Sequence, residues 1–459
     1  MTLPPPVSPE PWIDDRGTRR RAPVSDRSSV GSVVSVWLLS SVPGRKATRV
    51  SLQEALYFVG IDWAATEHAV CVLDRDGRRA DRFTIEHSAA GFARLAGKLG
   101  KLGDAEQVPV AIERPDGRLV DVLLEAGHPV VPVKSNAIKV WREAEVLSGA
   151  KSDPGDAEVI ADYLRVRIHR LRPAAPHSPQ TKALRTVVRT RTDLVEARVA
   201  AVNQLAALLD AFWPGAKAIF ASLDSVIALA FLSKYPTALA GKTLSEKKIA
   251  AFCTKQGYSG KKPAAVLLAR LRSAPAGATD PTVCEGVRDA VLAQVTVLTA
   301  LNTAIKALDQ SVADRMDSHP DGEIFRSFPR AGTVNAAQIL VEWGDAREAF
   351  DHPDAVAALA GVTPVTKASG KQRGVSFRWA CNKRFRVAIT TFADNSRHAS
   401  GWAAGIYSRA RADGKDHPHA VRILARAWIR VMWRCWQDRT PYDPTRHGPR
   451  QGTETAAAA

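Results

Sequence analysis

The sequence predicts an α/β domain near the N-terminus, a long helical middle and a mostly α-helical C-terminal part. Short apolar runs separated by turn residues fill residues 57–133, whereas apolar residues recur at three- and four-residue spacing in residues 179–213 and 287–316. The chain of 459 residues is 45% hydrophobic and 24% charged, which is typical of a globular protein. This composition excludes a fibre and a wholly disordered chain.

Residues 1–54 are expected to form a disordered extension, because prolines crowd the start and no apolar period is sustained. The apolar stretch 33–42 is too short to span a membrane and lacks the pattern of a signal peptide, and no run of 18 apolar residues occurs. The five cysteines are scattered, and no C-x-x-C is present. We therefore expect a cytoplasmic protein without disulfides or a membrane partner.

Residues 55–173 are expected to form the α/β domain, in the order β-β-β-α-β-α-β-α. Short links between the first three strands predict an antiparallel meander, and the helical crossovers predict parallel pairing afterwards, with the first and fourth strands side by side. The expected strands are residues 57–63, 68–73, 82–85, 108–113 and 129–133. The expected helices are residues 89–102, 117–125, 136–147 and a helix that ends near 167.

Residues 174–322 are expected to be helical and similar to a coiled coil, with Pro214 ending the first long helix. A nearly heptad seam in the second helix could pair within the chain or with another chain, and the intervening residues 215–285 form a helical insert. Residues 323–443 are expected to be mostly helical, with an element similar to a helix-hairpin-helix at 328–340 that could hold a phosphate. Residues 444–459 are expected to be a disordered tail.

The positive charge is concentrated near the C-terminus. The chain carries 64 Lys and Arg against 47 Asp and Glu, a net charge of +17. Between Val362 and Arg439 there are 16 Lys and Arg and 4 Asp and Glu, and 16 − 4 gives a local charge of +12. A nucleic acid is the natural partner of such a segment, although a solvated basic surface has the same composition.

Four carboxylates are candidates for a metal site. Asp62 ends the first predicted strand and Glu113 ends the fourth, so parallel pairing would bring them together. Asp153 and Asp156 lie three residues apart at the start of a helix, where both can face one side. Oxygen ligands of this kind suit Mg²⁺ or Mn²⁺, and two such ions support phosphodiester chemistry.

Each carboxylate also has an ordinary structural explanation. Asp153 followed by Pro154 and Asp156 is a good helix start, Asp62 could be a turn residue, and Glu113 could pair with Arg114. Taken together, their order and spacing favour one metal site over four unrelated roles.

Three motifs resemble the DEDD transposases of the insertion-sequence-110 family. They are Gly60-Ile61-Asp62-Trp63-Ala64, Ala111-Ile112-Glu113-Arg114-Pro115 and Lys151-Ser152-Asp153-Pro154-Gly155-Asp156-Ala157. The resemblance implies an RNase H-like fold for residues 55–173, similar to the RuvC-type Holliday-junction resolvase. It also implies a C-terminal transposase domain with a nucleophilic serine, which falls at Ser369 in the stretch 361–371.

A serine next to a glycine in a basic loop is by itself more often a turn, and as a nucleophile it needs activation by a base or a metal. Five tryptophans interleave with the basic residues, namely Trp379, Trp402, Trp428, Trp433 and Trp436. We expect most of the last three to lie in the core and some of the five to stack on nucleobases. The residues expected to bind nucleic acid are Lys367, Lys371, Arg373, Arg378, Lys383 and Arg384.

The resemblance further implies donor and target DNA as partners, guidance by a structured noncoding RNA, and a homo-oligomer, either a dimer or a tetramer. We interpret the sequence as that of a DNA recombinase that uses Mg²⁺ or Mn²⁺ and a covalent serine intermediate. The first alternative is a structure-selective nuclease of the resolvase class that uses water. An actin-like sugar kinase would need further glycine-rich loops, which the sequence lacks, and a DNA-binding relic would not need all four carboxylates.

Overall fold

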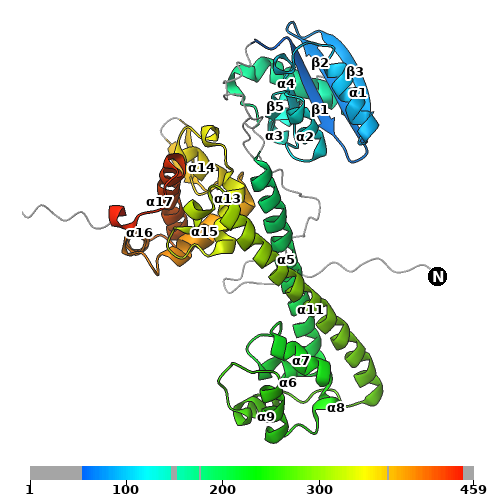
Figure 1. The fold of residues 1–459 in the computed structure, drawn as a ribbon, viewed down its shortest axis with the longest axis vertical. Helices are drawn as coiled ribbons and strands as arrows, with labels where there is room; N and C mark the ends of the chain where they lie inside the picture. The colour runs from blue at the N-terminus through cyan, green and yellow to red at the C-terminus, as the bar shows by residue number, and fades with distance from the viewer. Residues whose placement is uncertain (1–53, 146–151, 175–176, 370–371, 448–459) are drawn as a thin grey trace, which may run out of the picture.

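The computed structural model describes residues 54–145, 152–174, 177–369 and 372–447 (Figure 1). An α/β unit and a C-terminal helical unit lie near one end of a pair of long helices, and a cap of short helices lies at the other end (Figure 1). The predicted extension, apart from Glu54, and most of the predicted tail lie outside the described residues.

The α/β unit contains one five-stranded mixed sheet in the order β3-β2-β1-β4-β5. Strand β1 is antiparallel to β2 and parallel to β4, and β4 is parallel to β5, so the predicted meander and the parallel pairing of the first and fourth strands are confirmed. The strands are β1 (Tyr57–Trp63), β2 (Glu67–Asp74), β3 (Arg79–Glu86), β4 (Val110–Ile112) and β5 (Val130–Pro132). Strand β3 is longer than predicted, and β4 and β5 are shorter.

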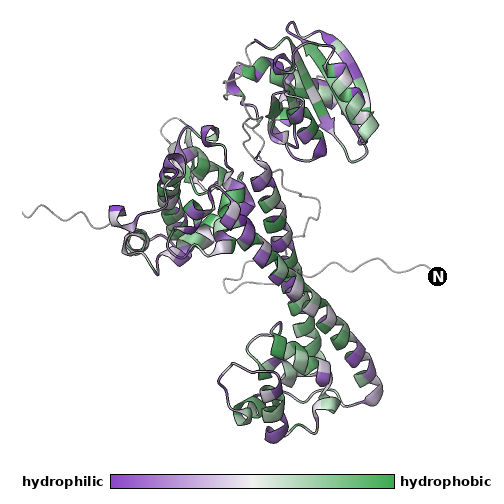
Figure 2. Cartoon of the chain, in the orientation of Figure 1, coloured by the Kyte–Doolittle hydropathy of each residue, from purple (hydrophilic) through white to green (hydrophobic). Residues whose placement is uncertain are grey.

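Helices cover both faces of this sheet. Successive strand side chains point to opposite faces, so strand residues are buried on both sides. The helices are α1 (Ala89–Leu99), α2 (Arg118–Glu125), α3 (Ser135–Glu145) and α4 (Asp153–Arg167), with short 3₁₀ turns at Ala105–Gln107 and Ile168–Arg170. One apolar layer joins Val59 and Ile61 to α1 and α2, and the other joins Phe58 and Ala111 to α3 and α4. Figure 2 shows the central strands as the hydrophobic part of this unit.

Gly60 allows α4 to pack directly on β1. A β-carbon at this position would overlap the carbonyl oxygen of Ala157 and the backbone nitrogen of Ala161. Ala157 and Ala161 are themselves fully buried and small, so backbone lies against backbone at this crossing. This close approach places the first turn of α4 over the sheet face that carries Gly60.

The long helices α5 (Pro179–Phe212) and α11 (Pro281–Ser318) pack against each other within one chain (Figure 1). Buried residues of α11 recur every seven positions, as a coiled-coil seam requires. These residues are Cys284, Val291, Leu298, Ile305 and Val312. Pro214 does not simply end a helix as predicted: α5 ends at Phe212, and Pro214 begins α6, where its missing N–H costs nothing.

The cap comprises α6 (Pro214–Ile219), α7 (Val226–Lys234), α8 (Ala238–Gly241), α9 (Glu246–Lys255) and α10 (Ala264–Ser273). It shares one hydrophobic core with the adjoining ends of α5 and α11. In the part of the chain that the structure describes, α11 is also the one helix long and apolar enough to cross a membrane, by length and composition alone. Of its most apolar stretch, 22% is buried.

The C-terminal unit is mostly helical, as predicted, but it also contains a hairpin. Residues 361–371 were expected to be a loop, whereas β6 (Val365–Ser369) and β7 (Gln372–Ser376) pair antiparallel, with Ser369 opposite Gln372. The sequence carries no strand signal here because the hairpin residues whose burial is described are largely exposed on both faces. The helices are α12 (Gly322–Arg326), α13 (Thr333–Trp343), α14 (Pro353–Leu359), α15 (Lys383–Ser396), α16 (Gly401–Ala412) and α17 (His417–Asp438), with 3₁₀ turns at Arg347–Ala349 and Pro444–His447.

Aromatic residues fill the core of this unit. Trp428 and Trp436 are fully buried and Trp433 packs partly buried against the same cluster, which confirms the predicted core positions. Trp402 contacts Trp428 edge to face, with ring centroids 4.8 Å apart. Trp379 is different, since 78% of it is exposed.

Replacing Gly60 by alanine should destabilise the α/β unit, because the added methyl group must separate β1 from α4. We expect the free energy of unfolding to fall by about 1–3 kcal/mol, as for an overpacked core, with a clear fall in the thermal midpoint. Gly97→Ala in α1 is the matched control, since its β-carbon would meet open space, and alanine is the better helix former. A Gly60→Ala variant that unfolds with the wild-type midpoint would contradict this account of the crossing.

Candidate functional site

Two of the predicted carboxylates are neighbours at one edge of the sheet. The parallel register pairs Ile61 with Ile112, so Asp62 and Glu113 are the next residues of β1 and of the β4 segment. Asp62 shares the sheet face of Gly60 because successive strand side chains alternate. Glu113 accepts a hydrogen bond of 2.7 Å from the Ser135 hydroxyl at the start of α3, which covers the same face.

The other two carboxylates lie in the first turn of α4. The helix is capped by Ser152, whose hydroxyl accepts from the Gly155 N–H, and not by Asp153 as the structural explanation supposed. Asp153 is exposed, whereas Asp156 is 7% exposed and forms an ion pair of 2.8 Å with Arg142 of α3. Neither aspartate side chain caps the helix: Asp153 is exposed to solvent, and Asp156 is bound by Arg142.

The four residues share one face of the sheet, but their side chains do not form a single cluster. Among the described residues, no group of three or more His, Cys, Asp and Glu side chains is gathered closely enough to hold a metal ion. Arg142 and Ser135 hold two of the four carboxylates instead. The shared metal site of Asp62, Glu113, Asp153 and Asp156 therefore stays a prediction.

At the same edge, the opposite face of the sheet carries residues for which the sequence predicted no chemical role. The Nε2 of buried His68 lies 2.8 Å from the Nδ1 of exposed His87, and burial lowers the pKa of His68. The guanidinium of Arg114 lies 4.3 Å from the centroid of Trp63 and pairs with Asp116, so the suggested pair with Glu113 is replaced by another. The sequence signal that could have identified Trp63 and Arg114 is their position, since each directly follows one of the two motif carboxylates, Asp62 and Glu113.

The predicted nucleophile lies at the tip of the hairpin. Ser369 is the last residue of β6 and is exposed, and its register partner on β7 is Gln372. Lys367 and Arg373 lie on the two strands, while Lys371 lies outside the described residues. Between residues 361 and 393 there are seven Lys and Arg and no Asp or Glu.

The other predicted phosphate-binding residues lie beside the hairpin base and at the start of α15. Arg378 is half-buried, and its Nε donates to the Thr363 carbonyl oxygen at 3.0 Å. Lys383 and Arg384 are exposed in the first turn of α15, and Arg384 pairs with Asp193 of α5 at 2.9 Å. Their binding to nucleic acid stays a prediction.

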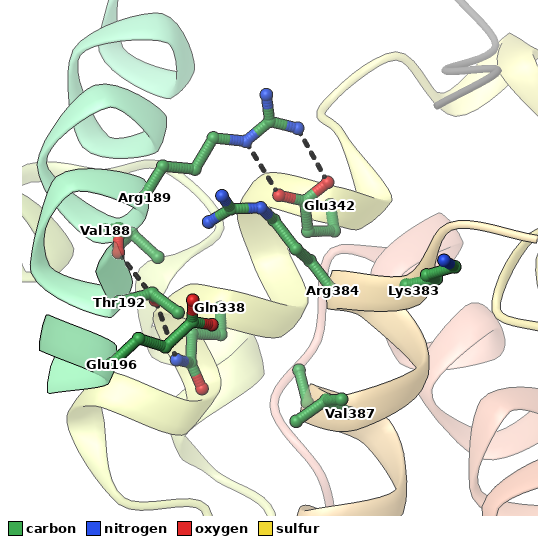
Figure 3. A pocket seen from close by; sticks show the side chains of 10 residues that line it. Val188, Arg189, Thr192, Glu196, Gln338, Glu342, Lys383, Arg384 and Val387 are labelled. Atoms are coloured by element: carbon green, nitrogen blue, oxygen red, sulfur yellow. Dashed lines mark hydrogen bonds and ion pairs between the residues drawn. The ribbon is translucent and has the colours of Figure 1, made fainter. Parts of the chain in front are cut away.

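A pocket between α5, α13 and α15 lies next to these residues (Figure 3). Its lining includes Arg189, Glu342, Lys383 and Arg384, with Arg189 pointing at Glu342 from the opposite wall (Figure 3). Arg189 donates two hydrogen bonds of 3.0 Å to the Glu342 carboxylate, and Asn382 donates a third of 2.7 Å. Asn382 also caps α15 by accepting from the Phe385 N–H, so the buried carboxylate positions this helix start.

The charge of Glu342 is maintained by its partners. Burial by itself would raise the pKa of this carboxyl group, but the hydrogen bond from Arg189 and the charge of Arg185 more than offset burial and hold the pKa below its ordinary value. The ion pair from Arg185 measures 3.6 Å, and its side chain is only 10% exposed. Glu342 therefore remains an anion between two cations of α5.

Side chains in the first turns of α5 bind both the α/β unit and the C-terminal unit. The Lys182 ammonium binds the Asp121 carboxylate of α2 in the α/β unit, and Arg189, two turns along, binds Glu342 of the C-terminal unit. Asp345, two residues beyond the end of α13, accepts from the Ser178 N–H at 3.0 Å and from the Thr181 hydroxyl at 2.9 Å. The sheet edge and the hairpin are thus held at the same end of α5.

Replacing Glu342 by glutamine should destabilise the C-terminal unit, because Arg185 and Arg189 would keep buried charges without an anion. Breaking such a pair from one side costs about 3–5 kcal/mol, which urea unfolding at pH 7 would detect. Because the pKa of Glu342 is lowered in the folded chain, the wild type keeps this stabilisation at neutral pH and loses it as the pH falls through that lowered pKa. Glu323→Gln, at an exposed site in α12, is the control, and equal midpoints for the two variants would contradict the assignment.

Comparison with known proteins shows two family matches. Residues 59–214 match a transposase family model of the DEDD type from IS110 elements, and residues 322–408 match the transposase model of the IS116/IS110/IS902 family. The first match contains the four carboxylates, and the second contains the hairpin and Ser369.

Three relatives align with nearly their whole length. The mini-circle protein of Streptomyces coelicolor named as a transposase for IS117 is 31% identical over 398 residues, which cover 85% of this chain and 96% of the relative. The 42 kDa protein of insertion element IS900 from Mycobacterium paratuberculosis is 27% identical, with 87% and 99% covered. The 43.6 kDa protein of IS110 from Streptomyces coelicolor is 27% identical, with 84% and 95% covered.

Proposed function

The chain belongs to the IS116/IS110/IS902 family of transposases, and we propose that it breaks and rejoins the DNA of an insertion sequence through an ester between Ser369 and the DNA. The observation that carries the proposal is the register that sets Asp62 beside Glu113, with α4 packed across the same sheet face. The mixed sheet is consistent with an RNase H-like domain. The exposed hairpin serine, in a basic segment without Asp or Glu, supports the proposed ester with DNA.

The sheet face fits a divalent metal by its donor chemistry. Asp62, Glu113, Asp153 and Asp156 offer only carboxylate oxygens, the ligands that Mg²⁺ and Mn²⁺ prefer. The guanidinium of Arg142 already binds Asp156 at 2.8 Å, so this position accommodates positive charge. When bound there, the metal would act as a Lewis acid toward a phosphate oxygen and favour ionisation of an attacking hydroxyl group.

The serine would supply the covalent step. Its Oγ attacks the scissile phosphorus, the hydroxyl proton passes to a base or solvent, and the departing DNA oxygen leaves as a hydroxyl group after it takes a proton. The ester between Ser369 and phosphate keeps the phosphodiester energy, and the hydroxyl of another strand can attack it to restore the serine. A hydroxyl group is a weak nucleophile, so this step requires the acidic face of the α/β unit to meet the hairpin.

The proposed partners are donor DNA, target DNA and a structured noncoding guide RNA, of which the RNA rests on the family resemblance alone. Self-association into a dimer or tetramer is supported by α11, whose most apolar stretch is only 22% buried inside the chain. A structure-selective nuclease with water as the nucleophile is the alternative function. It would use the same carboxylates and would leave no protein on the DNA.

Replacing Asp62 by asparagine should abolish strand cleavage while nucleic-acid binding persists, since the substitution removes a metal ligand but leaves the basic unit intact. Loss of about 4 kcal/mol of transition-state stabilisation corresponds to about 10³-fold in rate. Cleavage of a labelled DNA carrying an element end, with Mg²⁺ or after chelation, measures the effect. Asp76→Asn in the exposed β2–β3 turn is the control, and near-normal cleavage by Asp62→Asn would overturn the metal-site assignment.

Ser369 should be found covalently bound to DNA when rejoining is blocked. A suicide substrate that loses its free strand after cleavage should trap the ester, and peptide mapping should locate it at Ser369. Ser369→Ala should lose the adduct and retain binding, with Ser376→Ala at the other end of the hairpin as a matched control. Cleavage without any protein–DNA adduct, retained in Ser369→Ala, would instead establish the nuclease alternative.

A further inference from the structure

Trp379 is exposed where a tryptophan would ordinarily be buried. It is 78% exposed, in contrast to the fully buried Trp428 and Trp436 of the same unit. The residue lies three positions beyond the end of β7, and therefore at the base of the hairpin that carries Ser369. A strand rise of about 3.3 Å per residue separates the base of this hairpin from its tip by roughly 13 Å.

The backbone around Trp379 is held in place. Arg378 donates from Nε to the Thr363 carbonyl oxygen at 3.0 Å, and its own carbonyl oxygen accepts from Arg386 of α15. The ring of Phe377 meets Trp379 edge to face, with centroids 4.9 Å apart. Phe377 in turn lies 4.4 Å from the Arg386 guanidinium and 5.0 Å from that of Arg422. The indole is thus supported on one side and presented to solvent.

The chain segment that contains Trp379 is cationic rather than apolar. The nearest charged residues in the sequence are Arg373, Arg378, Lys383, Arg384 and Arg386, and no Asp or Glu occurs between residues 361 and 393. Large exposed hydrophobic residues of this stretch are few among the residues described, namely Val375, Trp379 and Val387. A protein-binding patch would require a broader apolar area, whereas a single aromatic ring among cations suits a base on a phosphate chain.

We propose that Trp379 is a stacking platform for an unpaired nucleobase next to the hairpin of Ser369. The inference rests on the proposed function, because it takes nucleic acid as the ligand of this unit. Every base has a flat π face, so such a platform holds a strand without reading its sequence. The cations would hold the flanking phosphates, and the indole would keep one base out of the helix stack beside the reactive hairpin.

Equilibrium binding of the full-length protein tests the platform without any cleavage. Fluorescence anisotropy in EDTA would compare oligothymidylate, oligouridylate and an abasic DNA of equal length. Trp379→Ala should weaken binding of the base-containing strands by about 5- to 150-fold, as expected for the loss of one stacked base, and leave binding of abasic DNA unchanged. A larger loss of affinity for oligothymidylate identifies a deoxyribose strand as the preferred ligand, and a larger loss for oligouridylate identifies a ribose strand.

Two further variants separate stacking from other causes. Trp379→Phe should retain more affinity than Trp379→Ala because a phenyl ring still stacks, and Val375→Ala, at a 67% exposed neighbour on β7, should behave as the wild type. Equal losses on abasic and base-containing strands would overturn the proposal, as would unchanged affinity of Trp379→Ala or a change confined to self-association in sedimentation. The assay measures binding in EDTA without any cleavage, so failure of the covalent mechanism would leave this result standing.

Discussion

The buried carboxylate of Glu342 is the interaction on which the arrangement of the C-terminal unit depends. An isolated buried charge is costly, so this anion is stable only while Arg185, Arg189 and Asn382 surround it. These partners belong to α5 and to the residue that caps α15. One carboxylate therefore couples the long helix to the helix that supports the basic segment, and the positions of Lys383, Arg384 and Arg386 follow from it.

A second constraint acts in the α/β unit, where α4 can approach β1 only because residue 60 has no side chain. This contact sets the first turn of α4 on the face of Asp62, and the β1–β4 register adds Glu113. The two constraints differ in kind. Backbone contact orders the acidic face, whereas charge pairing orders the basic unit. Both units are fastened to the first turns of α5, through Lys182 in one case and Arg189 in the other, so the same helix end holds the acidic and the basic halves of the proposed chemistry.

Much of the fold could be predicted because it follows from local periodicity. The strands of the meander alternate or are wholly apolar, and the seam of α11 repeats every seven residues, so both could be located from the sequence. The hairpin of β6 and β7 could not be located in this way, because its residues of described burial are largely exposed on both faces and no apolar period marks it. Likewise the capping of α4 by Ser152 and the pairing of Asp156 with Arg142 depend on backbone geometry and on a residue of another helix, for which a single sequence carries no signal.

The sequence by itself determined the chemical inventory: three acidic motifs in order, a serine in a basic segment free of acids, and tryptophans among arginines. Residue type and spacing along the chain are enough for that, since metals prefer oxygen ligands and phosphates prefer cations. Only the tertiary structure decided which members of this inventory are available. It buried Trp428 and Trp436 and left Trp379 exposed, it placed Lys383 and Arg384 at the surface, and it set Asp62 beside Glu113. Availability is decided by packing between elements distant in the chain, and therefore it cannot be deduced from the order of residues alone.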